Sequence, residues 1–560
     1  PPRGGWAGRQ GGGWAGGLGW GLGYEGLVRL RADLPAMVPE TALALVFAGI
    51  GTLATINRWP PAVAALATLA LAAVVGAYFI EPVMRRGLAA GERIVPAPGD
   101  GMAMATGFCL LCLGIAIVAL AVPVARALSR QRFPGRGALI ALLGAPFILP
   151  VIVAVLGLLA VFGGNGLVNQ LTGALGLPRI DIYGYHGVIL AHVFFNLPLA
   201  TRLILQGWLA IPAERFRLAA SLDAPVGRLL ERPMLRRIAP GAFAVIFVIC
   251  LTSFAVALTL GGGPRATTVE LAIYQAFKFD FDLAKAATLA LVQLALGIAS
   301  ALALLLLSPP DGFGAGLDRL QARWDGRSRP ARLGDALWIG FAALFLLTPL
   351  AMIVLAGLPG LMVLPVETWQ AALRSVSVAL GATALTLVLA LPLATRAGEL
   401  AGLLGVAVSG LVLGTGLFLI VQPLMRPAEA ALPVTLLVNA LMALPFVLRI
   451  LRPELDAARA DFGRLAATLG ITGFALWRIV LLPRLRRPLG FAAGLTAALS
   501  MGDLGVIALF ADGEHATLPL QLYRLMAAYR MEAAQGAALL LLTLSLGLFW
   551  LFDKGGRANA

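Results

Sequence analysis

An acidic residue inside a long apolar run is the first candidate for chemistry in this sequence. Asp503 lies within residues 489–510, which are otherwise almost entirely apolar or small. A carboxylate at membrane depth is costly unless it faces a cavity or a polar partner, so it is by default a functional hypothesis. One interpretation is that Asp503 lines or gates a pathway. The alternatives are a hydrogen bond to a neighbouring helix, or a position near the outer interface.

Two further polar residues, His192 and Asn196, lie one helical turn apart in the apolar run 186–210. They either line the same pathway or hydrogen-bond a neighbouring helix, and we favour the hydrogen bond. The three histidines of the chain, at positions 186, 192 and 515, are scattered. We therefore predict no metal site.

The cysteines offer a weaker signal. Cys109 and Cys112 form a CxxC pair, and Cys250 stands alone; all three lie in apolar runs. A metal or redox site would be accompanied by a second CxxC or a histidine pair, and neither is present in the sequence. We interpret the three as small buried residues.

A phosphate-binding loop is also lacking. The motif GxxxxGK[ST] requires a lysine directly after a glycine, and none of Lys278, Lys285 and Lys554 follows one. We predict that the chain is not an enzyme that hydrolyses ATP by this route, and we expect no cofactor.

The elements that must position these residues are membrane helices. Of the 560 residues, 59% are hydrophobic and 13% charged, whereas soluble domains are about 45–50% apolar and about 25% charged. The apolar runs are continuous, which favours helices over a β-barrel. We predict an all-α integral membrane protein with about twelve transmembrane helices. The runs lie at residues 61–80, 103–125, 137–163, 186–210, 240–262, 286–307, 336–358, 370–394, 401–424, 430–450, 489–510 and 535–552.

The N-terminal residues do not fit this pattern. Residues 1–36 are rich in glycine and tryptophan and read as low complexity or a mis-called start. The weaker apolar run at 41–56 is either a further span or a re-entrant piece.

Basic residues are concentrated in alternate connections between the runs. Arginines gather at 126–136, 215–237, 319–332 and 452–487. Because cytoplasmic loops carry the excess of Lys and Arg, we predict that these loops and both termini are cytoplasmic. The net charge of +15 then reflects topology, and we expect no nucleic-acid partner.

The sequence repeats itself once. Leu197-Pro198 matches Leu444-Pro445, and residues 217–223 match residues 464–470, all at an offset of 247. Beyond that point the offset is 250, so the first copy is three residues shorter within one loop. We predict two parallel halves, 61–307 and 336–552, joined by a cytoplasmic linker at 308–335.

The repeated loops contain a pattern suited to docking. In the second copy we predict a short helix from Arg464 to Leu469 that ends at Gly470, a residue that tolerates the left-handed C-cap conformation. An amphipathic stretch with Phe474 and Trp477 follows. Such a loop either docks into a groove on a partner or simply connects two helices. Its occurrence at two equivalent places favours docking to a two-fold symmetric partner.

This pattern resembles the EAA loop of type I ABC-importer permeases. The resemblance implies that the loop forms a coupling helix, which sits in a cleft of a separate ATPase subunit. In the first copy, Asp223 stands where glycine is usual and Pro225 interrupts the pattern. The positions that the resemblance assigns to the coupling loops are Ala219, Ala220 and Asp223 in the first copy, and Ala466, Ala467, Gly470 and Pro483 in the second.

Longer stretches resemble the thiamine ABC-transporter permease family, over roughly residues 103–552. They are RQRFPGR at 130–136, ILPVIVAVLGLLAVFG at 148–163, YGYHGVILAHVFFNLPLATRLILQ at 183–206 and LGGGPRATTVELAIYQA at 260–276.

The resemblance implies a type I ABC-importer permease fold in the bacterial inner membrane. It implies import of thiamine and its phosphates, delivered by a periplasmic binding protein and driven by a separate ATPase, which would act as a dimer. Ferric-iron permeases, which are also fused twelve-helix proteins, and permeases for other small solutes remain alternatives. A secondary transporter of the major-facilitator type also has twelve helices in parallel halves, but Asp503 is nearly alone among ionisable residues inside the runs.

The stretch after residue 261 is a candidate outer surface for the binding protein. The acids Glu270, Asp280 and Asp282 follow a glycine-rich turn there. We predict that they face the binding protein, with a solvated loop face as the equal alternative.

Overall fold

The computed structural model describes residues 102–261, 268–307, 328–395 and 408–557, together with Arg323, Asp325, Gly326 and three isolated residues between 396 and 407. Every regular element in this part of the chain is a helix. Ten helices within it are long and apolar enough to cross a membrane. The prediction of an all-α integral membrane protein is confirmed.

Part of the predicted set of spans lies outside the described residues. The runs at 41–56 and 61–80 and the segment 1–36 lie outside the described residues. The run at 401–424 contributes only a shorter apolar helix, Gly410–Val421, within the described residues. The count of twelve stays a prediction.

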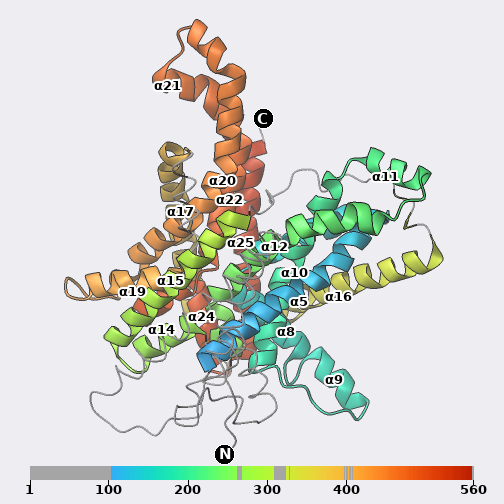
Figure 1. Ribbon diagram of the computed structural model, residues 1–560. Coiled ribbons are helices and arrows are strands. Elements are labelled where there is room, and N and C mark those ends of the chain that lie inside the picture. Colours follow the sequence, from blue (N-terminus) through green and yellow to red (C-terminus); the bar gives the residue numbers. More distant parts are fainter. Residues whose placement is uncertain are drawn as a thin grey trace, which may run out of the picture.

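The elements fall into two series along the chain (Figure 1). The first series is α5 (Met102–Arg130), α6 (Arg136–Leu142), α7 (Ala145–Ile148), α8 (Val151–Phe162), α9 (Leu167–Ala174), α10 (Tyr185–Ala210), α11 (Ala213–Ser221), η1 (Gly227–Glu231), α12 (Arg232–Leu251), α13 (Ala255–Leu260), α14 (Val269–Lys278) and α15 (Leu283–Leu307). The second is α16 (Arg329–Gly360), η3 (Leu361–Val363), α17 (Val366–Leu393), α19 (Gly410–Val421), α20 (Ala431–Thr468), α21 (Gly473–Leu476), η4 (Trp477–Leu481), α22 (Leu482–Met501), α23 (Gly505–Phe510), α24 (Leu518–Ala527) and α25 (Met531–Arg557).

The bounds of several elements recur at the offset found in the sequence. The π-helical turns η1 and η4, the helices α12 and α22, and the helices α13 and α23 each begin and end 250 residues apart. Each π-helical turn directly precedes a helix with proline in its first turn, Pro233 or Pro483. A proline ring clashes with the carbonyl four residues earlier, and the wider turn relieves this clash.

Two of the predicted spans are interrupted helices. The run 240–262 contains α12 and α13, separated at residues 252–254, and the run 489–510 contains α22 and α23, separated at residues 502–504. The two interruptions lie next to each other, because a methyl group added at Gly505 would lie 3.7 Å from the Phe254 ring.

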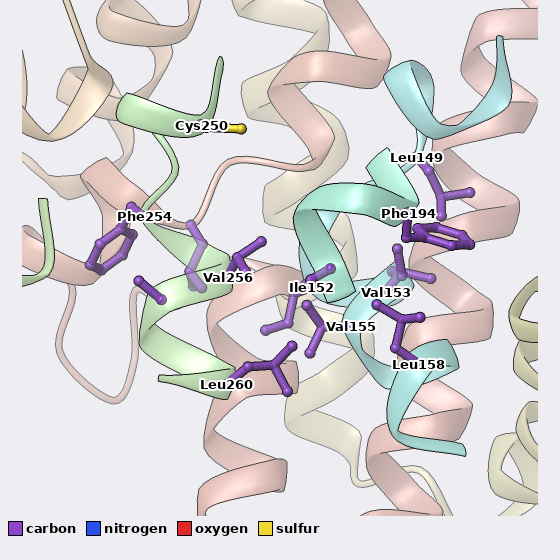
Figure 2. Close-up of a cluster of buried hydrophobic side chains, with 14 of the residues drawn as sticks. Leu149, Ile152, Val153, Val155, Leu158, Phe194, Cys250, Phe254, Val256 and Leu260 are labelled. Carbon is purple, nitrogen blue, oxygen red and sulfur yellow. The ribbon is translucent and has the colours of Figure 1, made fainter. Parts of the chain in front are cut away.

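Buried apolar side chains surround the first interruption (Figure 2). In Figure 2, Val256 and Leu260 of α13 point toward Ile152 and Val155 of α8. All four side chains are at most 1% exposed. This packing, and not a break in the hydrophobic pattern, fixes α13 as a separate short helix.

Small residues let the helices of the second half approach closely. A methyl group at Gly494 of α22 would lie 2.8 Å from the Phe549 carbonyl oxygen of α25. Gly360 of α16 and Gly536 of α25 face each other in the same way. Close backbone approach of this kind is how small residues pack membrane helices.

The short helix predicted from Arg464 to Leu469 is not separate. Those residues form the end of α20, which runs without a break to Thr468. In the first half, the equivalent helix is divided into α10 and α11 at Ile211-Pro212. Proline drives the preceding residue out of the helical region, and the second copy has Arg459 instead of proline at that place.

Candidate coupling segments and transport pathway

The first of two candidate docking segments comprises residues 213–233, here called the first coupling segment. Helix α11 ends at Ser221, and Asp223 adopts the left-handed conformation, with φ of 46°. The Asp223 N–H donates to the Ala220 carbonyl (3.4 Å), and the Ala224 N–H donates to the Ala219 carbonyl (2.8 Å). This pair of bonds is the Schellman motif that terminates many helices.

The second coupling segment, residues 460–483, ends its helix in the same way. Gly470 is left-handed, with φ of 67°. Its N–H donates to the Ala467 carbonyl (3.2 Å), and the Ile471 N–H donates to the Ala466 carbonyl (2.9 Å). The alanine pairs predicted as site residues therefore supply the carbonyls that close each turn.

The departure of the first copy from glycine does not change the shape of this turn. Asp223 takes the conformation that Gly470 takes, at the equivalent position. Aspartate is among the residues that tolerate the left-handed region best after glycine. Ala219 and Ala466 are buried, whereas Ala220 and Ala467 are exposed.

Both segments present large apolar side chains to solvent at matching positions. We call Leu218, Leu222 and Leu229 the first coupling surface, and Leu465, Leu469 and Ile479 the second coupling surface. Their exposed fractions agree pair by pair: Leu218 (59%) and Leu465 (57%), Leu222 (68%) and Leu469 (65%), Leu229 (57%) and Ile479 (60%).

The two segments lie at one end of the molecule. Figure 1 shows α11 and α21 projecting at the upper end of the view, the same end as the C-terminus.

Asp503 lies at the interruption between α22 and α23. Its Oδ1 accepts a hydrogen bond from the Gly505 N–H (3.2 Å). Its Oδ2 is buried and has no hydrogen-bond partner among the described residues. The equivalent residue of the first interruption is Ser253, so the carboxylate is present on one side only.

His192 and Asn196 are both buried in α10. The Asn196 side-chain amide donates to the His192 carbonyl (2.9 Å) and to Cys250 Sγ of α12 (3.5 Å). Asn196 thus makes the interhelical contact that the sequence favoured. No hydrogen bond in the described part of the chain joins either residue to Asp503.

The second half has a comparable contact that sequence reasoning missed. The Asn439 amide donates to Ser500 Oγ (2.9 Å), and these residues are equivalent to His192 and Cys250 by the repeat offsets. Applying the offsets to every polar residue in an apolar run would have found the pair.

Two predictions about single residues are wrong. Glu270 is fully buried and accepts a hydrogen bond from Gln293 Nε2 (2.9 Å), so it cannot face a binding protein. Cys112 is exposed on α5, whereas Cys250 is buried as predicted. The prediction for Cys112 assumed that every residue in an apolar run is covered by protein, but one face of a membrane helix meets lipid.

Ten membrane-length apolar helices in the described part of the chain define a multi-pass membrane protein, and its two projecting segments are consistent with an ABC-transporter permease. In the described part of the chain, no three His, Cys, Asp or Glu side chains come together in a way that could hold a metal ion.

Comparison with known proteins narrows the class. The chain is 42% identical over 456 residues to the thiamine transport system permease protein ThiP of Salmonella typhimurium, a match that covers 78% of this chain and 85% of the relative. It is 40% identical over 457 residues to ThiP of Escherichia coli, with 78% and 85% covered. It is 39% identical over 461 residues to ThiP of Brucella abortus, with 79% and 85% covered.

The chain belongs to the family of thiamine transport system permease proteins. No family description and no solved structure matches it.

Proposed function

We propose that this chain is the membrane permease of an importer for thiamine and its phosphates in the bacterial inner membrane. A periplasmic binding protein would deliver the substrate, and a separate ATPase dimer would hydrolyse ATP. The observation that carries the proposal is the pair of matched coupling surfaces in a chain of the thiamine permease family.

The coupling surfaces support docking to the ATPase dimer. Each surface places three apolar side chains on a projecting segment whose backbone is closed by a Schellman turn. Exposed apolar groups on a short helix suit an apolar groove on a partner. Because the same turn and the same side chains occur twice, each subunit of a symmetric dimer would receive one segment.

The positions of the arginines indicate how the chain is oriented in the membrane. The coupling segments contain or adjoin the densest arginine clusters, which the charge rule assigns to the cytoplasm. The C-terminus lies at the same end (Figure 1). The ATPases and the C-terminus are therefore assigned to the cytoplasmic side, and the charge rule predicts the same side for the N-terminus.

The adjacent helix interruptions are the proposed pathway. Interrupted helices at equivalent places of two repeats are typical of substrate sites in transporters, because their free helix ends face the cavity. Asp503 brings a carboxylate to this point with one oxygen unpartnered among the described residues. It would contact the cationic ring of thiamine, while His192 and Asn196 would support the wall of the pathway.

The mechanism is alternating access. ATP-driven closure of the ATPase dimer would draw the two coupling segments together, and the membrane halves would rock about the adjacent interruptions. The interruptions would then open to one side at a time.

Co-purification tests the division of labour. The tagged chain, purified in detergent from cells that also express the ATPase, should retain the ATPase, and Leu469→Asp should release it because a charge cannot enter an apolar groove. Arg557→Gln, at the exposed Arg557–Asp553 pair of α25 (2.7 Å), is the matched control. Retention of the ATPase by Leu469→Asp would contradict the proposal.

Competition tests the substrate. Uptake of labelled thiamine should fall in excess unlabelled thiamine or thiamine diphosphate and should ignore ferric iron. Inhibition by ferric iron, with no inhibition by unlabelled thiamine, would contradict the proposal that thiamine is the substrate.

A further inference from the structure

The two coupling segments are anchored to the membrane helices by opposite chemistry. At the base of the first segment lies Glu231, the last residue of η1, which is 5% exposed. Its equivalent in the second segment is Leu481, buried in an apolar cluster with Leu455 and Leu485. A buried carboxylate therefore stands where the second half has a leucine.

Three donors surround Glu231. Arg323 Nη2 lies 2.5 Å from Glu231 Oε1, and Arg126 Nη2 lies 2.9 Å from Oε2. The Trp208 indole N–H donates to Oε1 (3.1 Å). Burying a carboxylate is tolerated only when it is paired and hydrogen-bonded, and both conditions are met here.

Arg323 belongs to the stretch between α15 and α16, which joins the two halves. Its side chain is 1% exposed and its guanidinium lies over the ring of Phe216 in α11, 4.6 Å from the centroid. It also contacts Asp325 Oδ2 (2.7 Å). One arginine from outside the segment thus holds both α11 and η1.

The contacts continue from Asp325 to the second half. Arg130 of α5 lies 3.5 Å from Asp325 Oδ2 and 2.5 Å from Asp335 Oδ1 in α16. Burial alone would raise the pKa of Asp325, but the hydrogen bonds and charges of Arg323, with the charges of Arg130 and Arg126, lower it below its ordinary value. The network joins three carboxylates and three guanidiniums: Glu231, Asp325, Asp335, Arg126, Arg130 and Arg323.

We propose that Arg323 is a positioning residue for the first coupling segment, which it ties through Glu231 to α5 and to the start of α16. The first segment then moves as one body with α5 and the start of α16. The second segment has an apolar base at Leu481, and its ion pair with α22, Arg484–Asp461 (4.0 Å), is exposed, so it moves independently of that network. This inference rests on the proposed function, because it assigns a transport role to the docking of the ATPase.

The charged anchor differs from an apolar one in a way that can be measured. Apolar contacts are non-directional, whereas guanidinium–carboxylate bonds fix geometry. Replacing a buried ion pair by apolar residues often preserves stability. A variant with apolar residues in place of Glu231 and Arg323, like the apolar base at Leu481, should therefore fold. Its first coupling segment should no longer be held in position.

Cross-linking to the ATPase is the test. The native cysteines are first substituted, and a single cysteine then replaces Leu222 in one variant and Leu469 in another. In the assembled complex, this cysteine is cross-linked to a cysteine placed in the ATPase groove. Arg323→Gln keeps Glu231 paired with Arg126. It removes the Arg323 contact to Glu231 and should lower the cross-link yield at position 222 by at least about tenfold, the factor for one charged hydrogen bond, and leave position 469 unchanged.

The double variant Glu231→Leu with Arg323→Met separates positioning from stability. It should recover the thermal stability of the parent, yet still cross-link poorly at position 222 and hydrolyse ATP with weaker stimulation by the loaded binding protein. Arg557→Gln is the control and should match the parent in every readout.

The outcomes distinguish this inference from the proposed function. Equal yields at positions 222 and 469 in Arg323→Gln, or full recovery of the position 222 yield in the double variant, would overturn the positioning role alone. Failure of the parent to cross-link at both positions would overturn the proposed function.

Discussion

At the scale of single residues, position 223 shows that a residue can differ from the motif and still adopt the backbone conformation that the motif requires. The first coupling segment has an aspartate where the resemblance leads one to expect glycine, yet Asp223 and Gly470 both adopt positive φ. Ala219 and Ala466 accept the same closing hydrogen bond. The conformation of the turn, and not the identity of the residue, is what the two segments share.

Substitution of Asp223 should therefore act locally. Asp223→Val should loosen the turn by about 1–2 kcal/mol, because a β-branched residue is strained at positive φ, whereas Asp223→Gly should not. Limited trypsin digestion at the exposed Arg217 and Arg228 should accelerate in Asp223→Val. Cleavage at Arg464 in the second segment serves as the internal control, and an unchanged ratio of the two would contradict this view of the turn.

The carboxylate of Asp503 should matter for transport through its charge. Asp503→Asn keeps an oxygen that can accept the Gly505 N–H bond but removes the negative charge. We expect uptake of thiamine to fall about tenfold, as for the loss of one charged contact, while the ATPase stays bound. Ser253→Ala at the equivalent position is the control; equal uptake by both variants would assign Asp503 a purely structural role.

Glu270 should make the stability of the protein depend on pH. Burial raises the pKa of Glu270 from its ordinary 4.5 to about 7, against the lowering effect of hydrogen bonds from Ser409 and Gln293. The folded state therefore binds more protons than the unfolded state between these values, so stability should fall as pH rises from about 4.5 to about 7 and level off above. Thermal unfolding in detergent should show this slope, and Glu270→Gln should flatten it; an identical slope in the variant would refute the assignment.

At the scale of the elements, hydrophobic runs located the described spans but not their interruptions. The runs 240–262 and 489–510 each hold two helices. Residues Thr252, Ser253 and Phe254 include neither glycine nor proline, so no local signal marks the first break. It arises from the packing of α13 against α8, which involves residues about a hundred positions apart in the chain.

A local feature of the sequence does explain why one predicted helix boundary is absent. The predicted short helix at Arg464–Leu469 is the end of the long helix α20, and the separate α11 of the first half follows Pro212. The presence of that proline in one copy only was visible in the sequence.

Close helix approach in the second half should be sensitive to side-chain size. Gly494→Leu would force a side chain against the α25 backbone at Phe549 and should destabilise the protein by about 1–3 kcal/mol. Gly547→Leu on α25 meets open space and should be tolerated. Similar melting temperatures for the two variants would show that α22 and α25 can separate without cost.

At the scale of the whole molecule, several elements recur at a fixed offset in the chain, but the chemistry of their side chains does not. The coupling turns, π-helical turns and interrupted helices recur, whereas Asp503 and the Glu231 network each occur on one side only. The network was beyond sequence reasoning because its members lie up to about two hundred residues apart. Its one local sign was an acid among arginines at the place of Leu481.

The matched coupling surfaces make the central claim testable: the chain transports thiamine with energy from an ATPase docked at both segments. The direct measurement is uptake of labelled thiamine by proteoliposomes that contain the chain, the ATPase and the loaded binding protein. The account predicts uptake that requires ATP and stops with vanadate. It also predicts that uptake is lost in the double variant that combines Leu222→Asp and Leu469→Asp. Uptake that follows a proton gradient without ATP, unchanged in the double variant, would contradict it.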